Sequence, residues 1–507
     1  MNRRRASRAR AAALSLTGLL GLTTLTACVG GEEEPAAAGE ERLRLAMLLP
    51  PRSGLSPFSD DAFKLSRWST GETLVRLDAD GVAQPVLATA WEQQDDPRTW
   101  HLDLRAGVTF HDGTALTSAE VVTALNAVTA ADPVPRVLDG VDLEAAAVDD
   151  DTVAVTTAVA DPLLPNRLSS PQLTILSPAA YDGGPVDPVG TGTGPFELTE
   201  VAGTTGATLE RYDDYWGEPA VLDGIDVTFV PDGTARAAAL RTGTADVVEA
   251  VPVAQAAAIG DDLLHEVAMP RTNTLYLNND TGPFADPAVR AAARAAIDRA
   301  LLVSDVYEGR ADVAEGLLGP AIPWAAELRA PVAGAEPASP AEVGGAEITL
   351  GTFTDRAELP EVAVLIEQAL EVAGFEVTQD VREYQFIEAD ALAGEFDAFV
   401  LSRATLLDTG DPVAYFASDF SCEGGFNIAQ LCDPAVDAAI ERAAGLAPGP
   451  ERQAATMEIE SLLLARDAVV PLLHERVLQG EAAGVADVAR DPRERELVTS
   501  ISAVTAR

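Results

Sequence analysis

Residues 347–401 read EITLGTFTDRAELPEVAVLIEQALEVAGFEVTQDVREYQFIEADALAGEFDAFVL, and this stretch decides the fold class. Apolar runs at its start, middle and end have the length and composition of buried strands. Between them lie two helical stretches, 361–373 and 385–393, and Gly374 is typical of a helix end. Strands that alternate with helices predict an α/β fold. The three predicted strands are residues 347–353, 375–381 and 396–401.

The last of these strands leads into an acidic turn and a pair of cysteines. Residues 408–412 read DTGDP, and Cys422 and Cys432 follow ten residues apart. A metal site would need further ligands, and no histidine lies nearby. In an exported protein such a pair indicates a disulfide, which would stabilise the fold by about 2–3 kcal/mol. A carboxylate on a rigid turn beside a closed loop suits a cationic group.

Length and charge limit the possible partners. A chain of 507 residues is too long for one core, so two or three domains are expected. Acidic residues number 80 against 35 basic ones, which gives a formal net charge of −45. This charge repels nucleic acid and anionic lipid, so neither is an expected partner. The simpler interpretation is solubility and biased composition, since Lys64 is the only lysine.

The N-terminal residues are typical of an export signal. Five arginines within the first ten residues precede an apolar run, 11–25, that is too short to span a bilayer. Residues 25–28, LTAC, resemble the bacterial lipobox, in which the cysteine becomes lipid-modified after cleavage. We therefore predict a lipoprotein signal peptide at 1–27, lipidation of Cys28 and a tether at 28–41. The alternative is that Cys28 is merely a small apolar residue of the signal peptide.

Three further local patterns can be compared with a structure. Residues 42–50 alternate and then become apolar, which indicates an edge strand. Thr117 and Glu120 have capping-box spacing ahead of an apolar helical stripe at 121–130. The segment 330–345 is rich in Pro, Ala and Gly and indicates a surface loop.

Six sequence blocks together resemble family 5 extracellular solute-binding proteins, the peptide- and nickel-type receptors of ABC importers. They occur in the family's order, and the resemblance extends from about residue 42 to residue 480. The blocks are LAxxW at 87–91, LRxGVxFHDG at 104–113, GTGPF at 192–196, YxxYWG at 212–217, TARAAALRTGTAD at 234–246, and 283–299 with its AIDR end.

The resemblance implies a two-lobed periplasmic-binding-protein-like α/β fold of class II, with central mixed sheets, a hinge and an extra subdomain. It implies a monomeric receptor with no enzymatic activity and no cofactor. Such a receptor captures a peptide or peptide-like solute in an interlobe cleft and delivers it to a membrane permease driven by ATPases. By analogy the segments are 42–75, 185–268 and 470–507 for lobe I, 76–184 for its extra subdomain and 269–469 for lobe II.

The DTGDP turn and the cysteine loop resemble the dipeptide-binding branch of the family. There the first aspartate of the turn holds the peptide's α-ammonium group, so Asp408 is the expected ligand residue. The alternative is a turn aspartate that caps its own backbone, and we expect this role for Asp411. The branch's tryptophan ahead of the turn is absent, and Arg403 in that segment is a second candidate contact.

Three more residues are candidates for the ligand site. Phe353 stands where dipeptide binders carry an arginine for the peptide carboxylate, and Arg356 is close enough in sequence to replace it. Tyr384 and Trp68 are candidates for lining the pocket, although aromatic residues at such positions also serve as core.

Other functions have weaker sequence support. A nickel-chelate or other small-solute receptor of the same family is one alternative, and a receptor that signals without transport is another. An exported hydrolase would need an ordered nucleophile and base, and no G-x-S-x-G motif is present. Neither His265-Glu266 nor His474-Glu475 continues into H-E-x-x-H, so no catalytic or metal site is predicted.

Overall fold

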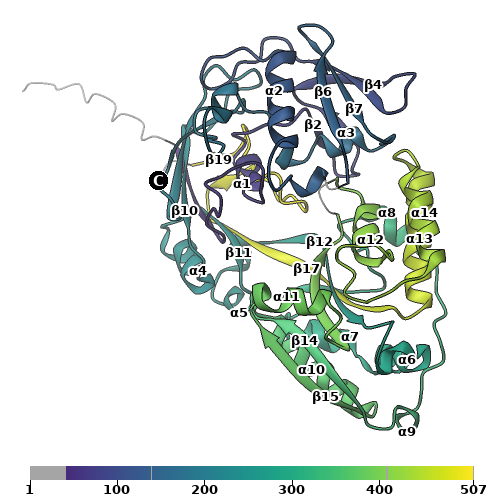
Figure 1. Ribbon diagram of the computed structural model, residues 1–507. Helices are drawn as coiled ribbons and strands as arrows, with labels where there is room; N and C mark the ends of the chain where they lie inside the picture. Colours follow the sequence, from purple (N-terminus) through teal and green to yellow (C-terminus); the bar gives the residue numbers. More distant parts are fainter. Residues whose placement is uncertain (1–40, 139, 407–408, 506–507) are drawn as a thin grey trace, which may run out of the picture. The chain divides into compact units, whose positions relative to one another are not determined.

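The computed structural model describes residues 41–138, 140–406 and 409–505. Its main element is a mixed sheet in which β14 and β1 have parallel neighbours while most other pairs are antiparallel (Figure 1). In spatial order the strands are β15 (Phe375–Arg382), β14 (Ala346–Phe353), β16 (Ala398–Ala404), β12 (Leu264–Leu277), β17 (Val469–Glu481), β11 (Val247–Val251), β1 (Arg42–Met47), β10 (Gly224–Phe229), β9 (Gly206–Arg211) and β8 (Phe196–Val201), with β13 (Ala311–Val313) beside β17.

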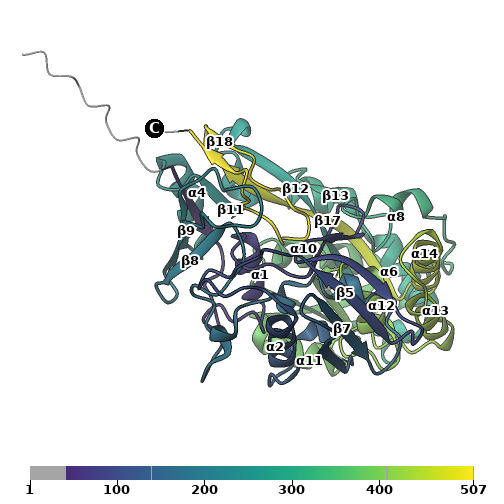
Figure 2. The same ribbon diagram turned by 90° about the horizontal axis from the view of Figure 1, so that it is seen from above.

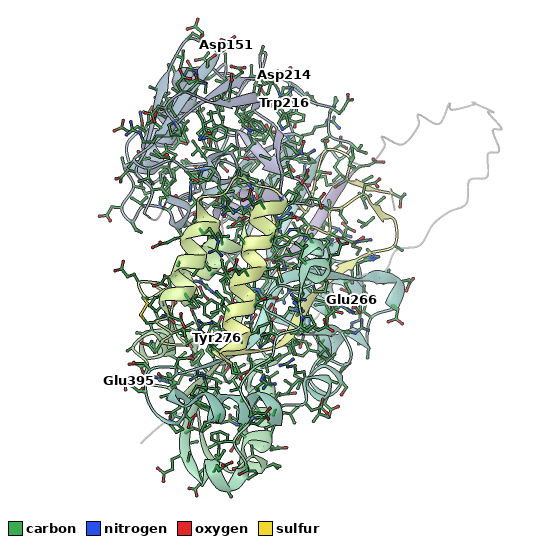
Figure 3. The ribbon with its side chains drawn as sticks, turned by 90° about the vertical axis from the view of Figure 1, so that its right-hand side faces the viewer. Asp151, Asp214, Trp216, Glu266, Tyr276 and Glu395 are labelled. Carbon is green, nitrogen blue, oxygen red and sulfur yellow. A yellow bond between two sulfur atoms is a disulfide. The ribbon has the colours of Figure 1, made fainter. Side chains whose placement is uncertain are left out.

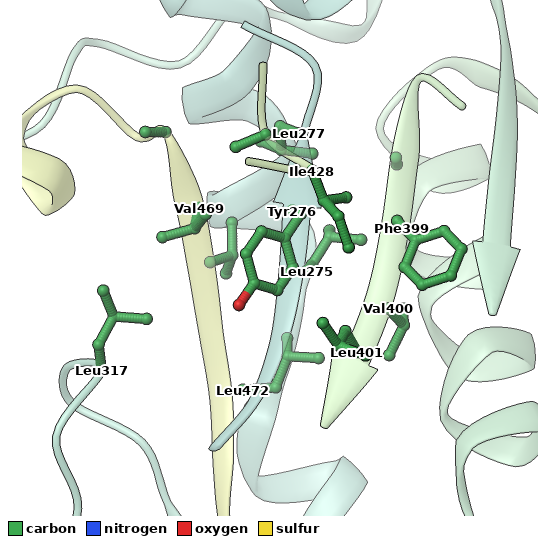
Figure 4. Close-up of a cluster of buried hydrophobic side chains, with 14 of the residues drawn as sticks. Leu275, Tyr276, Leu277, Leu317, Phe399, Val400, Leu401, Ile428, Val469 and Leu472 are labelled. Carbon is green, nitrogen blue, oxygen red and sulfur yellow. The ribbon is translucent and has the colours of Figure 1, made fainter. Parts of the chain in front are cut away.

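Lobe II is the part of the chain around β14, β15 and β16. Figure 4 shows its core around Tyr276, with Val469 and Leu472 from β17 on one side and Leu401 from β16 on the other. The helices α13 and α14 of this lobe pack side by side (Figure 3). Its helices are α6 (Pro287–Ala296), α7 (Arg299–Asp305), α8 (Pro323–Leu328), α9 (Pro340–Val343), α10 (Leu359–Val372), α11 (Tyr384–Leu392), α12 (Pro412–Phe420), α13 (Pro434–Ala444) and α14 (Pro450–Ala465).

The α/β unit predicted for 347–401 is confirmed. Strands β14, β15 and β16 and helices α10 and α11 begin and end within three residues of the predicted limits. Apolar residues of α10 at helical spacing, among them Val362 and Ile366, are completely buried. The predicted loop at 330–345 is irregular except for α9.

Lobe I contains β1 and β8–β11 and carries a separate antiparallel sheet. That sheet, ordered β4-β5-β7-β6, has its own apolar core and is packed against α2, whose predicted capping box at Thr117 and Glu120 is present. Additional elements of lobe I are α1 (Ala62–Arg67), β2 (Val75–Leu77), β3 (Ala83–Pro85), β4 (Ala88–Gln93), β5 (Thr99–Leu104), α2 (Ser118–Thr129), β6 (Leu143–Ala147), β7 (Thr152–Thr157), α3 (Leu164–Arg167), α4 (Gly233–Thr242), α5 (Val253–Ala256), β18 (Val485–Ala486) and β19 (Ala503–Val504).

The edge-strand prediction for the N-terminal strand is wrong. β1 lies between β10 and β11 and is parallel to both. Its partners come from about 180 to 200 residues further along the chain, and local alternation carries no information about such pairings.

Two long strands, β12 and β17, connect the lobes. Near Tyr276, β12 lies between β16 and β17, whereas the C-terminal half of β17 pairs with β11 of lobe I. The long strands are seen running together in Figure 2. Their register shifts between Ala268 and Thr272, a local irregularity that bends and twists a strand pair. Because one sheet continues through both lobes, the predicted segment boundaries stay a prediction, while the two-lobed α/β fold class is confirmed.

Across residues 41–138, 140–406 and 409–505, no helix has both the length and the apolar character needed to cross a membrane. The predicted signal peptide, Cys28 and nearly all of the tether fall outside these described residues.

Candidate functional site

The acidic turn leads into helix α12, and its Asp411 side chain is held by an ion pair with Arg452. Asp411 caps the helix, since its Oδ1 accepts a hydrogen bond from the Val413 amide at 2.9 Å. The same carboxylate forms a two-pronged ion pair with buried Arg452, at 2.8 Å for each contact. The backbone-capping role expected for Asp411 is confirmed. Asp408, the expected ammonium ligand, lies outside the described residues.

The cysteine loop is closed as predicted by a disulfide between Cys422 and Cys432, with Cα atoms 4.4 Å apart. Asn427 spans the loop from inside: its amide donates to the carbonyls of Ser421 and Leu431 and accepts from the Leu431 amide. The loop is therefore held by a covalent bond and three local hydrogen bonds.

Arg403 is paired within lobe II. Its guanidinium donates to both oxygens of Asp419 at 2.7 Å and stacks on the ring of Phe426, with its central carbon 3.8 Å from the ring centroid. Burial raises the pKa of Asp419, against the lowering effect of Arg403. A buried carboxylate of this kind needs its cation, so Arg403 has a structural function whether or not a ligand also touches it.

Arg356 and Tyr384 also have protein partners. Arg356 donates to Glu475 at 2.8 Å, and the Glu475 side chain is 6% exposed. The Tyr384 hydroxyl donates to Glu388 at 2.7 Å, and its ring meets Phe353 edge-on at 4.9 Å. Burial and the neighbouring Glu388 raise the pKa of Tyr384.

Trp68 lies in the core of lobe I, away from any surface. It is fully buried, and its indole nitrogen donates to the sulfur of Met47 at 3.1 Å. This is the core alternative that the sequence left open for this residue.

The turn that follows Asp408 reaches lobe I. A Cβ atom added to Gly410 would overlap the Leu77 side chain at the end of β2. Asn166 of lobe I donates to the Gly81 carbonyl at 2.9 Å and to the Thr409 carbonyl at 3.5 Å. The two lobes therefore meet at this turn as well as along β12 and β17.

Arg493 of lobe I lies beside the same junction. Its guanidinium donates to the carbonyls of Asp78 and Ala79 at 2.5 and 2.9 Å, which holds the β2–β3 hairpin in place. Its Nε lies close to Gly410.

Sequence reasoning missed Arg271, which lies on β12 beside the register shift. Its Nη1 donates to the Ser402 carbonyl at 3.2 Å. Burial and the positive charge of Arg356 lower the pKa of Arg271 to about 10, while Glu475 and Glu494 act in the opposite direction. The available signal was its position: a charged residue directly after Pro270, next to the predicted lobe crossing at residue 269.

Two cavities occur in lobe II, away from this junction. One, of about 470 Å³, is mainly apolar and lies between α6, α7 and α10. The other, of about 400 Å³, is lined by Arg294, Arg299, Arg329 and Asp467 among others. Neither is lined by a residue of the contact that the turn at Thr409 and Gly410 makes with lobe I. Within the part of the chain that the structure describes, no group of three or more His, Cys, Asp or Glu residues could hold a metal ion.

Comparison with known proteins decides the family. Residues 82–427, more than half of the chain, match the bacterial extracellular solute-binding proteins of family 5. The chain belongs to this family. It is 29% identical over 304 residues to the probable ABC transporter periplasmic-binding protein SapA of Escherichia coli K12, covering 57% of this chain and 55% of SapA.

It is also 33% identical over 264 residues to the glutathione-binding protein GsiB of E. coli O1:K1, covering 50% of this chain and 51% of GsiB. The chain thus spans about half the length of these curated relatives. Both relatives are binding proteins by name, and SapA is named for an ABC transporter, in agreement with the expectation that this family member is no enzyme.

Solved structures share the fold over nearly the whole chain. The nickel ABC transporter protein of Bacillus halodurans superposes with a TM-score of 0.75 at 24% identity, over 92% of this chain and all of that one. DppA of Helicobacter pylori in complex with the peptide STSA gives 0.73 at 20% identity, over 92% and 98%. At these identities the likeness supports the fold alone.

Proposed function

We propose that this protein is an exported, lipid-anchored receptor that captures a small solute between its lobes and delivers it to the permease of an ABC importer. Family membership carries the proposal. The arrangement of the lobes supports it, because two strands connect them while the turn at Thr409 and Gly410 meets lobe I separately. Such a joint permits hinge closure around a ligand.

The proposed ligand is a peptide or peptide-like solute. GsiB is named for glutathione, and the H. pylori DppA structure holds a peptide, so both support this class. The alternative is a nickel chelate, supported by the structure of Staphylococcus aureus NikA with Ni(L-His)2, which has a TM-score of 0.73 and 21% identity.

Native mass spectrometry of the purified protein, followed by calorimetry with peptides and with nickel–histidine, tests the proposal. A retained or titrated peptide supports it, and binding of nickel–histidine alone supports the alternative. Release of hydrolysis products from the peptides would instead indicate an enzyme and overturn the receptor assignment.

Asp408 remains our proposed ligand for the α-ammonium group of a bound peptide. When an ammonium group is paired with a desolvated carboxylate, neutralising that carboxylate weakens the binding free energy by about 2–5 kcal/mol. Asp408→Asn should therefore weaken binding of an unmodified peptide by roughly 30-fold or more and leave an N-acetylated peptide unaffected. Glu423→Gln, an exposed carboxylate of the disulfide loop, is the matched control. Equal affinities for Asp408→Asn and the parent protein would refute this role.

The lipid anchor is proposed on Cys28. Cys28→Ala should move the protein from the membrane fraction to the soluble fraction and remove the lipid mass from its N-terminus. Retention of the variant in the membrane fraction would contradict lipidation at this residue.

A further inference from the structure

Three arginines of lobe II lie near the lobe junction, and the positive charges of Arg356 and Arg403 both act on Arg271. Two of them are neutralised by protein carboxylates: Arg356 by Glu475 and Arg403 by Asp419. Among the residues that the structure describes, Arg271 has no ion pair and makes one hydrogen bond, to the Ser402 carbonyl.

Arg271 is therefore an undersatisfied cation. A guanidinium carries five N–H donors in a rigid fork that matches the two oxygens of a carboxylate. The bond from Nη1 to the Ser402 carbonyl leaves Nε and Nη2 without a partner among the described residues. Arg271 is also half-buried, and the carboxylates that act on it, Glu475 and Glu494, form no ion pair with it. A partly buried charge without a directly bonded partner is costly. A cation whose donors lack a directly bonded carboxylate at such a position favours binding of an anion from outside the chain.

The position of Arg271 matches the place where a ligand would bridge the lobes. The residue lies on β12 within the register shift between Ala268 and Thr272, where the sheet passes from one lobe to the other. Its neighbour Pro270 accepts hydrogen bonds from the Thr405 amide and hydroxyl, which anchors the start of the segment leading to the interlobe turn.

Lobe I faces the same group of charges. The carboxylate of Glu494, in the C-terminal segment beyond β17, acts on both Arg271 and Arg356. Arg493, beside it, contacts the β2–β3 hairpin and lies close to Gly410. A solute held at Arg271 would thus be within the influence of both lobes.

We propose that Arg271, and not the already neutralised Arg356, binds a carboxylate group of the transported solute through Nε and Nη2. This inference rests on the proposed receptor function and adds the ligand class: a small solute with at least one free carboxylate. The carboxylate has two possible sources, the C-terminus of a peptide or the acid groups of a metal chelate. Both sources present the same planar anion to the guanidinium.

The test uses calorimetry on the full mature protein with three probes: a mixed tripeptide library with free C-termini, the same library as C-terminal amides, and nickel with L-histidine. We expect the parent protein to prefer free acids over amides. Arg271→Gln should weaken binding of the preferred acid probe by roughly 100-fold, and should abolish discrimination between acid and amide peptides. Arg271→Lys, which keeps the charge but loses the fork, should cost roughly tenfold.

Folding is controlled in the same series. Because Arg271 has no counter-ion in the described residues, Arg271→Gln should not lower the unfolding midpoint. Arg382→Gln, an ion-paired arginine on the outer strand β15, is the matched control and should leave binding unchanged.

Each outcome separates the inference from the function on which it rests. Loss of nickel–histidine binding in Arg271→Gln, with no peptide binding by the parent, supports the chelate source. Unchanged affinity of Arg271→Gln for a probe that the parent binds, or equal binding of acids and amides by the parent, overturns the role of Arg271 and leaves the receptor function intact. No binding of any probe by the parent protein overturns both.

Discussion

A substitution at Gly410 should have two separable effects: backbone strain at Gly410 itself and steric overlap with Leu77 of lobe I. Gly410 has a left-handed backbone with φ of +66°, and an added Cβ would overlap the methyl Cδ1 of Leu77 in lobe I. The backbone term is present in any conformation of the lobes. The overlap exists only where the turn meets lobe I.

Gly410→Ala should therefore change stability and affinity by different mechanisms. The left-handed conformation costs an alanine about 1 kcal/mol, which lowers the free energy of unfolding. The overlap should cost about 1 kcal/mol more, at the low end for overpacking because the Leu77 methyl group can rotate away. This second term opposes closure of the lobes and should weaken ligand binding roughly fivefold.

Leu77→Ala supplies the rescue. Calorimetric affinity, measured with whichever solute the parent protein binds, should return to within about twofold of the parent in Gly410→Ala/Leu77→Ala. The unfolding free energy from urea titration should stay lowered, since the backbone strain remains. A Gly410→Ala variant that binds like the parent, or a double variant that recovers stability but not affinity, would refute the reasoning.

Three further variants test the surroundings of the site. Arg452→Met removes the partner of Asp411 and should lower the unfolding free energy by about 3–5 kcal/mol in urea titrations; a loss below about 1 kcal/mol would contradict a buried, fully used ion pair. Replacing Cys422 and Cys432 by Ser should cost about 2–3 kcal/mol, the value for a short loop, and the reduced parent protein should unfold at the same urea concentration as the variant. Burial and Arg329 lower the pKa of His474 to about 4, below its value of about 6.5 in an unfolded chain, so its stabilising contribution is complete above pH 6.5 and is lost as the pH falls toward 4. Between pH 7 and pH 5, His474→Gln should lose about 2 kcal/mol less stability than the parent, and parallel losses in the two proteins would show that His474 does not titrate as described.

The α/β unit of lobe II could be predicted from the sequence because its information is local. Strand composition, helical periodicity and Gly374 are all contained in one stretch of about 55 residues, and the elements found there match. The neighbours of β1 could not be predicted. Its parallel partners begin near residues 224 and 247, and the alternation of charged and apolar residues at 42–50 does not indicate which strands pair with it.

In the candidate site, too, features that depend on local sequence could be predicted, and features that depend on distant residues could not. Cys422 and Cys432, and the capping role of Asp411, follow from short-range spacing. The neutralisation of Arg356 does not, because Glu475 lies 119 residues further along the chain. Sequence similarity marks the type of residue at a position, but the counter-ion that decides whether its charge is free comes from the tertiary fold.

That distinction explains why Arg271 was overlooked and why its charge matters. A position-by-position comparison with dipeptide binders directs attention to Phe353 and then to Arg356, its nearest cation. Arg356 already has Glu475 as a close partner, so a ligand carboxylate there would have to compete with a buried protein carboxylate. Among the described residues no carboxylate forms an ion pair with Arg271, although Glu475 and Glu494 act on it without one. Because Arg356 is already paired, we expect the anion contact at Arg271 on β12 and not near the end of β14. A carboxylate bound there would lie on a strand that connects the two lobes.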